Sequence, residues 1–126
     1  MTVRARRVYE APDAADGRRV LVDRLWPRGV SKERAHLDEW LKDIAPSDAL
    51  RKWFGHDPRR WEQFRERYLR ELRAPRAHEL LEGLVARARA GTVTLVYAAH
   101  DELHNDAVVL AEELARRMGR SAKFVP

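Results

Sequence analysis

The chain of 126 residues contains no cysteine. This absence excludes disulfide bonds, thiolate nucleophiles, cysteine zinc fingers and iron–sulfur clusters together. No apolar run reaches membrane-spanning length, and no basic stretch followed by an apolar one opens the sequence. A glycine-rich phosphate loop, a Gly-x-Ser-x-Gly turn and a dinucleotide fingerprint are also missing. We therefore expect a soluble, cytoplasmic protein without membrane association, outside the common classes of nucleotide-driven enzymes.

The composition predicts one globular domain over residues 1–126, because 44% of the residues are hydrophobic and the chain is too short for two domains. The formal net charge is +5 and the pI is about 10.1. This charge has two interpretations: an anionic partner such as nucleic acid, or codon usage combined with solvated helix faces on which acids and arginines alternate. We favour the second for the total charge and keep an anionic partner for the arginines near residue 25.

Periodicity predicts an α/β fold: a single domain with a small, mostly parallel sheet flanked by helices. We expect a strand over residues 92–98 that is covered on both faces, because it is nearly continuous in apolar character. Ser47, Asp57 with Pro58, and Asn105 are candidate helix starts, and Gly55, Gly91 and Gly119 are candidate helix ends. The predicted strands are 3–9, 19–23, 92–98 and 122–125; the predicted helices are 37–44, 47–54, 58–72, 75–90 and the segment from Asn105 to Gly119.

The most informative segment follows the apolar run Val20–Val22 and reads Asp23-Arg24-Leu25-Trp26-Pro27-Arg28-Gly29. Burying an aspartate or arginine without a partner costs several kcal/mol, so charges at a strand end indicate a site. Asp23 is a candidate general base, and it can equally be the structural partner of an arginine. Arg24 and Arg28 are candidates to grip a carboxylate or phosphate. Trp26 can stack on a ligand ring or pack at the edge of the core.

A second polar group follows the strand that ends near Tyr97. Because parallel strands end at one edge of a sheet, we expect both groups to form one pocket. Tyr97 is a candidate hydroxyl donor and Asp101 a candidate catalytic acid, while His104 and Asn105 are candidate ligand-binding residues. Asn105 can also cap the next helix, whose N-terminus would attract an anion.

Two histidine patterns have a functional and a structural interpretation. His56 with Asp57 can be an acid/base pair, although helix capping alone accounts for Asp57. His100 and His104 are four residues apart, a spacing that can hold zinc on a helix. The zincin motif needs Glu directly after the first His, and Asp101 stands there. We therefore predict no metal and no cofactor.

Three segments resemble the domain-of-unknown-function 488 family, in its YeaO-like branch. They are Val-Leu-Val-Asp-Arg-Leu-Trp-Pro-Arg-Gly at residues 20–29, Trp-Phe-Gly-His-Asp at 53–57 and Tyr-Ala-Ala-His-Asp-Glu-Leu-His-Asn at 97–105. The resemblance spans almost the whole chain and implies a compact three-layer α/β domain of bacterial cytoplasmic proteins. It implies no established function, although some relatives carry a transcription-regulator label.

Another branch of that family has a Cys at the end of the strand that matches residues 92–98, and a Cys-His-Arg just into the next helix. Tyr97 stands at the first of these places, and Asn105, Asp106 and Ala107 stand at the second. The thiol chemistry that this other branch suggests is therefore not implied for this chain.

Our leading hypothesis is a pocket at the strand carboxyl ends that binds, hydrolyses or transfers a small anionic or nucleotide-like ligand. Asp23 and His56 would be its acid/base groups, and Arg24 and Arg28 would hold the anion. The alternatives are a nucleic-acid-binding or regulatory module, with exposed arginines and aromatic rings on one face, and an adaptor whose tryptophan-rich surface binds another protein.

Overall fold

Short strands alternate with helices along the chain, and the computed structural model describes residues 2–119 and 123–125. The elements in chain order are β1 (Thr2–Arg7), the 3₁₀ helix η1 (Ala14–Asp16), β2 (Arg18–Leu21), α1 (Lys32–Ala35), β3 (Glu39–Trp40), η2 (Lys42–Ile44), α2 (Asp48–Phe54), η3 (Pro58–Arg60), α3 (Trp61–Glu71), α4 (Pro75–Ala90), β4 (Thr92–Tyr97), α5 (Asp106–Met118) and β5 (Lys123–Val125).

The strands form one sheet in the order β3-β2-β4-β1-β5, and every described pairing is parallel. Strand β4 lies at the centre, between β2 and β1. Its β-branched and apolar residues are buried on both faces of the sheet, which is typical of a central parallel strand. The predicted α/β class with a parallel sheet is confirmed.

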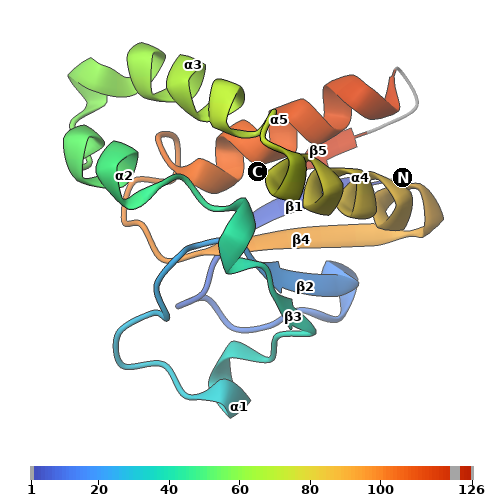
Figure 1. The fold of residues 1–126 in the computed structure, drawn as a ribbon. Helices are drawn as coiled ribbons and strands as arrows, with labels where there is room; N and C mark the ends of the chain where they lie inside the picture. Colours follow the sequence, from blue (N-terminus) through green and yellow to red (C-terminus); the bar gives the residue numbers. More distant parts are fainter. Residues whose placement is uncertain (1, 120–122, 126) are drawn as a thin grey trace.

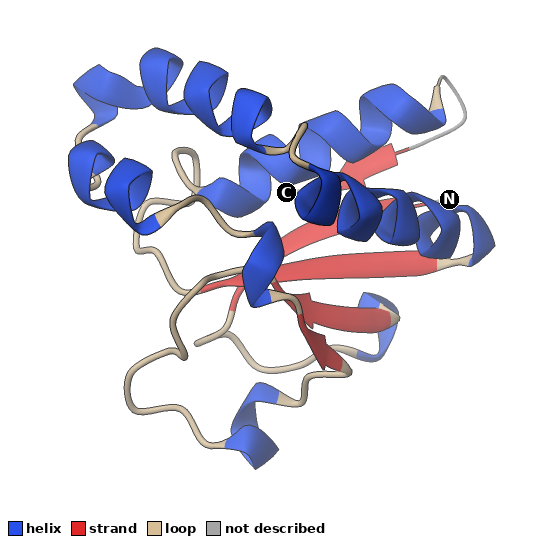
Figure 2. Cartoon of the chain, in the orientation of Figure 1, coloured by secondary structure: helices blue, strands red, loops and turns tan. Residues whose placement is uncertain are grey.

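The three layers differ in thickness (Figure 1). Helices α2 to α5 cover one face of the sheet and enclose the larger apolar core, whereas η1, α1 and the loops around them cover the other face (Figure 2). A smaller apolar cluster lies on that second face, around Leu21, Val30 and Val96. Within the described residues, no helix has both the length and the apolar character needed to cross a membrane.

Local helix signals in the sequence predicted α2 and the start of the next helical segment correctly. The Ser47 hydroxyl accepts a hydrogen bond from the Leu50 N–H at 3.1 Å, and Gly55 ends α2 with φ of 54°. Asp57 accepts from the Arg59 N–H at 3.0 Å, with Pro58 at the first helical position. These caps depend only on neighbouring residues.

The helix predicted over residues 37–44 is wrong. The segment instead forms the two-residue strand β3 and the short helix η2. Its backbone is hydrogen-bonded to β2. The Asp38 N–H donates to the Arg19 carbonyl and the Leu41 N–H donates to the Leu21 carbonyl, both at 2.9 Å. A partner strand far away in sequence thus overrides the local helical spacing.

The last strand and the apolar side of α3 complete the description of the elements. The last strand begins at Lys123, and Ala122, which we also expected in it, lies outside the described residues. On α3, Phe64 and Tyr68 are buried, whereas Trp61 is only partly buried against the core.

Candidate functional site

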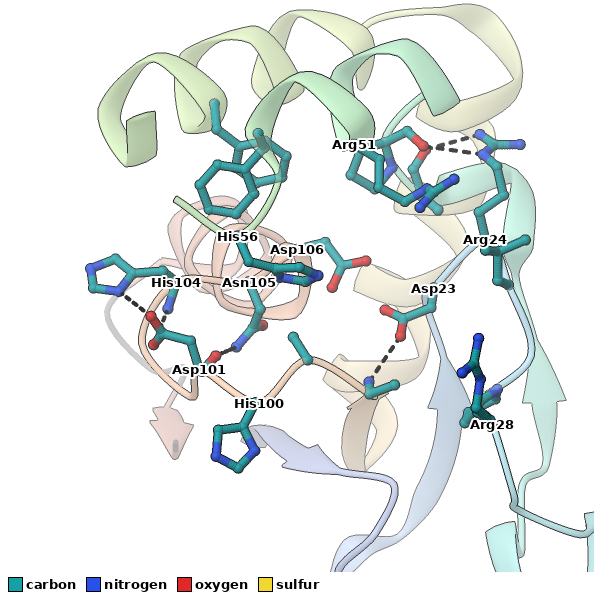
Figure 3. A pocket seen from close by; sticks show the side chains of 18 of the residues that line it. Asp23, Arg24, Arg28, Arg51, His56, His100, Asp101, His104, Asn105 and Asp106 are labelled. Carbon is teal, nitrogen blue, oxygen red and sulfur yellow. Dashed lines mark hydrogen bonds and ion pairs between the residues drawn. The ribbon is translucent and has the colours of Figure 1, made fainter. Parts of the chain in front are cut away.

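A cavity of about 900 Å³ opens beyond the carboxyl ends of β2 and β4. Its walls come from the segment after β2, from the end of α2 and the turn that follows, and from the loop between β4 and α5 (Figure 3). Because β2 and β4 are adjacent and parallel, their polar ends meet at one edge of the sheet. The expected convergence of Asp23 and Arg28 with the loop before Asn105 is present.

Asp23 is the residue by which the two strand ends are joined. Its carboxylate Oδ2 accepts a hydrogen bond from the Ala98 N–H at 2.8 Å, so the segment after β2 is bound to the end of β4. The Trp40 indole Nε1–H donates to the Asp23 backbone carbonyl at 2.7 Å. The main chain and the carboxylate of Asp23 are therefore both held in place at the cavity wall.

A second aspartate, Asp106, faces Asp23 across the cavity (Figure 3). Burial raises the pKa of the Asp106 carboxyl well above its ordinary value, and the Asp23 carboxyl beside it raises that pKa further. Burial also raises the pKa of Asp23, against the opposing effects of hydrogen bonds from Asp106 and the Ala98 N–H and of the charge of His56. Since two adjacent carboxylates repel each other, the pair holds its first proton more tightly than an isolated aspartate does.

Three arginines line the cavity on one side of this acid pair (Figure 3). The Arg24 guanidinium donates to the Pro46 carbonyl at 3.1 Å and to the Ala45 carbonyl at 3.2 Å, so its fork is fixed to the main chain. Arg28 and Arg51 are exposed, and Arg51 has one long contact of 3.4 Å with Asp48. Arg28 and Arg51 are therefore better placed than Arg24 to hold a ligand anion.

Trp26 lies in the cavity wall, half-buried. Its indole N–H donates to the Val30 carbonyl at 2.7 Å, and its ring meets the Trp40 ring edge-on at 5.5 Å. On the same wall, Tyr9 is 41% exposed, and its hydroxyl donates to the Arg28 carbonyl at 2.9 Å. The cavity thus has aromatic as well as charged surfaces.

His56 reaches the cavity from the turn after α2. Both Gly55 and His56 have left-handed backbone conformations, with φ of 54° and 57°. Histidine tolerates this conformation better than most residues but still pays a steric cost. The expected acid/base pair of His56 and Asp57 is not formed. The Asp57 carboxylate instead caps the next helical turn and accepts hydrogen bonds from the side chain of Arg59.

Asp101, His104 and Asn105 hold the loop between β4 and α5 in shape, and all three line the cavity. The His104 Nδ1 lies 2.8 Å from Asp101 Oδ2, and this hydrogen bond lowers the pKa of Asp101. Asn105 caps α5 by accepting from the Val108 N–H at 3.1 Å and donates to the Asp101 carbonyl at 3.0 Å. Asn105 is 3% exposed, so its amide is used within the protein.

Tyr97 does not line the cavity, contrary to our expectation. The side chains of β4 alternate between the two faces, and that of Tyr97 joins the larger core and is 3% exposed. Burial raises the pKa of its hydroxyl to about 12. We therefore remove Tyr97 from the candidate site.

The zinc interpretation of the histidines also lacks a matching geometry. Within residues 2–119, no group of three or more histidine, aspartate or glutamate side chains is arranged to hold a metal ion. In addition, the Nδ1 of His104 is engaged by Asp101.

Sequence reasoning missed two charged residues of the cavity, Asp106 and Arg51. Asp106 is the first residue of α5, where an acid is ordinary because it favours the helix N-terminus. Nothing in its neighbourhood along the chain indicates that it faces Asp23. Arg51 sits in the middle of a short helix and carried no signal.

Comparison with known sequences identifies a protein family. The family model described as "Inactive DUF488-N3 subclade" matches residues 2–124. Over 115 residues, 91% of this chain and 95% of the relative, the sequence is 44% identical to an uncharacterized protein of Mycobacterium tuberculosis. It is also 44% identical to the uncharacterized protein YeaO of Escherichia coli over 116 residues, which are 90% of this chain and 97% of YeaO.

No solved structure matches this chain. The family match covers nearly the whole domain, including every segment that forms the cavity. The chain therefore belongs to the DUF488 family, in its YeaO-like part.

Proposed function

We propose that the protein binds a small anionic or nucleotide-like molecule in the cavity and does not transform it. The observation that carries this proposal is the presence of Arg28 and Arg51 beside the Asp23–Asp106 pair in one cavity (Figure 3). The volume of about 900 Å³ is within the range of small-molecule sites. The description of the matching subclade as inactive favours binding over catalysis.

The Asp23–Asp106 pair favours a ligand that places a polar but uncharged group beside it. Two carboxyl groups that share one proton offer a hydrogen-bond donor and an acceptor side by side. An amide-like edge, with an N–H next to a C=O, is complementary to such a pair. Nucleobases carry edges of this kind, and Trp26 and Tyr9 add aromatic surface to the same cavity.

Arg28 and Arg51 favour a ligand that also carries an anionic group. Among the described residues, the Arg28 guanidinium has no hydrogen-bond partner, so its donors are available to a phosphate or carboxylate. Arg51 adds a second exposed guanidinium on the cavity wall. A proton shared by the acid pair would lower its negative charge, and an anion at the arginines would then meet less repulsion than two full carboxylates give.

The test is calorimetric titration of inorganic phosphate, a nucleoside and its 5′-monophosphate into the wild type, Arg28→Ala and Arg34→Ala. Arg34 is an exposed arginine of α1 that does not line the cavity, so it is the matched control. We expect the monophosphate to bind more tightly than either fragment. Arg28→Ala should weaken its binding about tenfold or more, since a hydrogen bond to a charged group contributes about 1.5–3 kcal/mol.

Two results would count against the proposal. If none of the three compounds binds at millimolar concentration, or if Arg28→Ala and Arg34→Ala behave alike, the cavity is not an anion site. If chromatography of the incubated monophosphate shows a product that Asp106→Asn no longer forms, the protein is an enzyme and the binding-only part is wrong.

A further inference from the structure

Most arginines on the helical face are neutralised by carboxylates. The ion pairs between different elements are Arg65–Glu112 at 3.0 Å, Arg76–Asp43 at 3.7 Å, Arg117–Glu82 at 2.6 Å and the close pair Arg87–Glu39. Pairs of this kind support our interpretation that the total positive charge reflects solvated helix faces. They also make any unneutralised group of cations conspicuous.

One such group lies on α2 and the second half of α3. Arg67, Arg70 and Arg73 follow one another at intervals of three residues, which places them along one side of the helix and the turn after it. Lys52 lies on α2, which packs against α3 through the stacked rings of Phe54 and Phe64 at 4.3 Å. All four cations are exposed. Among the described residues, none of them has a carboxylate within 4.0 Å.

A shallow groove of about 340 Å³ separates α2 from α3 on this side, and we call it the α2–α3 groove. Arg67, Arg70 and Trp53 line it, and the Arg67 guanidinium lies 4.2 Å from the centroid of the Trp53 ring. Glu71 lies there too, but its carboxylate accepts from the Ser47 N–H at 2.8 Å and the Ser47 hydroxyl at 2.6 Å. The Glu71 carboxylate is therefore held by Ser47 at the start of α2, whereas Arg67 and Arg70 have no carboxylate partner among the described residues.

We propose that the α2–α3 groove binds single-stranded nucleic acid through its phosphate backbone. Guanidinium groups at regular spacing match a chain of phosphates, and an aromatic ring between them offers a stacking surface for an unpaired base. The Arg67 guanidinium over Trp53 is exposed, and the exposed Arg60 guanidinium lies 5.3 Å from the centroid of the same ring. A base can replace either exposed cation on the ring, because both side chains are long and solvent-facing. This site is distinct from the cavity at the strand ends, with which it shares no lining residue.

The experiment measures binding of a fluorescent oligothymidylate by anisotropy over a range of sodium chloride concentrations. The test variant replaces Arg67, Arg70 and Arg73 by glutamine. The control variant replaces Arg76, Arg89 and Arg116 by glutamine; these exposed arginines lie on α4 and α5. Both variants lose the same net charge, so a general effect of charge appears equally in both.

We expect the test variant to bind at least about tenfold more weakly than the control. The slope of log K against log salt should fall by about 2, since each phosphate contact with a single strand contributes about 0.7. Trp53→Leu should weaken binding of the single strand more than that of a duplex of equal length. Circular dichroism and thermal melts confirm that each variant is folded.

Three results would overturn the proposal. The first is no binding by the wild type at low salt, and the second is an equal loss in the test and control variants. The third is preferential binding of a polyglutamate peptide, which would make the groove a docking site for an acidic protein segment.

Discussion

Two regions of the molecule bury aspartates, and they treat them in opposite ways. Asp16, at the end of η1, has no exposed surface and is surrounded by Arg4, Arg6 and Arg19. The Arg19 Nη1 lies 2.6 Å from Asp16 Oδ2, and Arg19 is itself 2% exposed. In the cavity, by contrast, the Asp106 carboxyl faces another carboxyl, that of Asp23 (Figure 3).

The pKa values follow from these surroundings. Burial alone would raise the pKa of Asp16, but hydrogen bonds from the Asp13 N–H, Arg19 and Arg6 outweigh it and lower the pKa. Burial raises the pKa of Asp106, and Asp23 raises it further. A buried acid whose charge is neutralised by arginines and hydrogen bonds stabilises a fold. A pair of neighbouring acids without such partners lowers the stability and indicates a site for a ligand.

The largest expected effect is that of Asp16→Asn. The substitution leaves the buried Arg19 without its counterion, and removing one partner of a buried ion pair costs about 3–5 kcal/mol. Urea unfolding at pH 7 measures the change. Asp13→Asn is the control, because Asp13 is an exposed helix cap near the same arginines, and asparagine caps as well as aspartate. Equal, small effects of the two substitutions would mean that the cluster around Asp16 does not stabilise the fold.

A smaller effect of opposite sign is expected for Asp106→Asn. Removing one acid of the cavity pair should raise the free energy of unfolding at pH 7 by about 1 kcal/mol, because burial and Asp23 disfavour the ionised form of Asp106 in the folded state and asparagine does not ionise. Asp48→Asn is the control, since Asp48 is the exposed first residue of α2 as Asp106 is of α5. Asp48→Asn should cost about 0.3–1 kcal/mol through the helix dipole.

The two aspartates also predict opposite pH dependences. The folded pKa of Asp106 lies above its unfolded value, so the wild type loses stability as pH rises from the unfolded pKa towards the folded one. The advantage of Asp106→Asn should therefore vanish below about pH 4, where both states are protonated. The folded pKa of Asp16 lies below its unfolded value, so its contribution is present at neutral pH and is lost as pH falls through the folded pKa. Unfolding curves between pH 3 and 8, compared for wild type and Asp106→Asn, measure this; a gap independent of pH would contradict it.

The sequence predicted what depends on neighbours along the chain. The caps at Ser47 and Asp57 and the central strand β4 were correct because short-range hydrogen bonds and apolar runs specify them. The joining of two polar strand ends also followed, because parallel strands share a carboxyl edge. The roles of the cavity residues stay predictions.

The failures have a common physical cause in contacts across the fold. Residues 37–44 have helical spacing but pair with β2. Tyr97 is the last residue of the apolar strand β4, and the alternation of side chains along β4 turns it into the core. Asp106 faces Asp23 from a helix that begins more than eighty residues later in the chain, which no local pattern reveals.

The smallest expected effect compares two strained histidines, His56 at the cavity and His36 at the end of α1. Both are exposed and have positive φ values, 57° and 50°. Glycine relieves the left-handed strain, worth about 1 kcal/mol, but adds unfolded-state entropy of about 0.5 kcal/mol. His56→Gly and His36→Gly should therefore each stabilise the protein by about 0.5 kcal/mol in urea unfolding.

Ligand binding should separate the two histidine variants although their stabilities agree. His56 lines the cavity beside the acid pair, whereas His36 does not line it. His56→Gly should weaken binding of a nucleoside monophosphate in calorimetry, and His36→Gly should leave it unchanged. A loss of stability in His56→Gly alone would show that its imidazole packs on Phe54, 6.3 Å away between ring centroids, for structural reasons. The left-handed conformation of His56 would then serve the stability of the fold, as the ion pairs around Asp16 do, and would not serve ligand binding in the cavity.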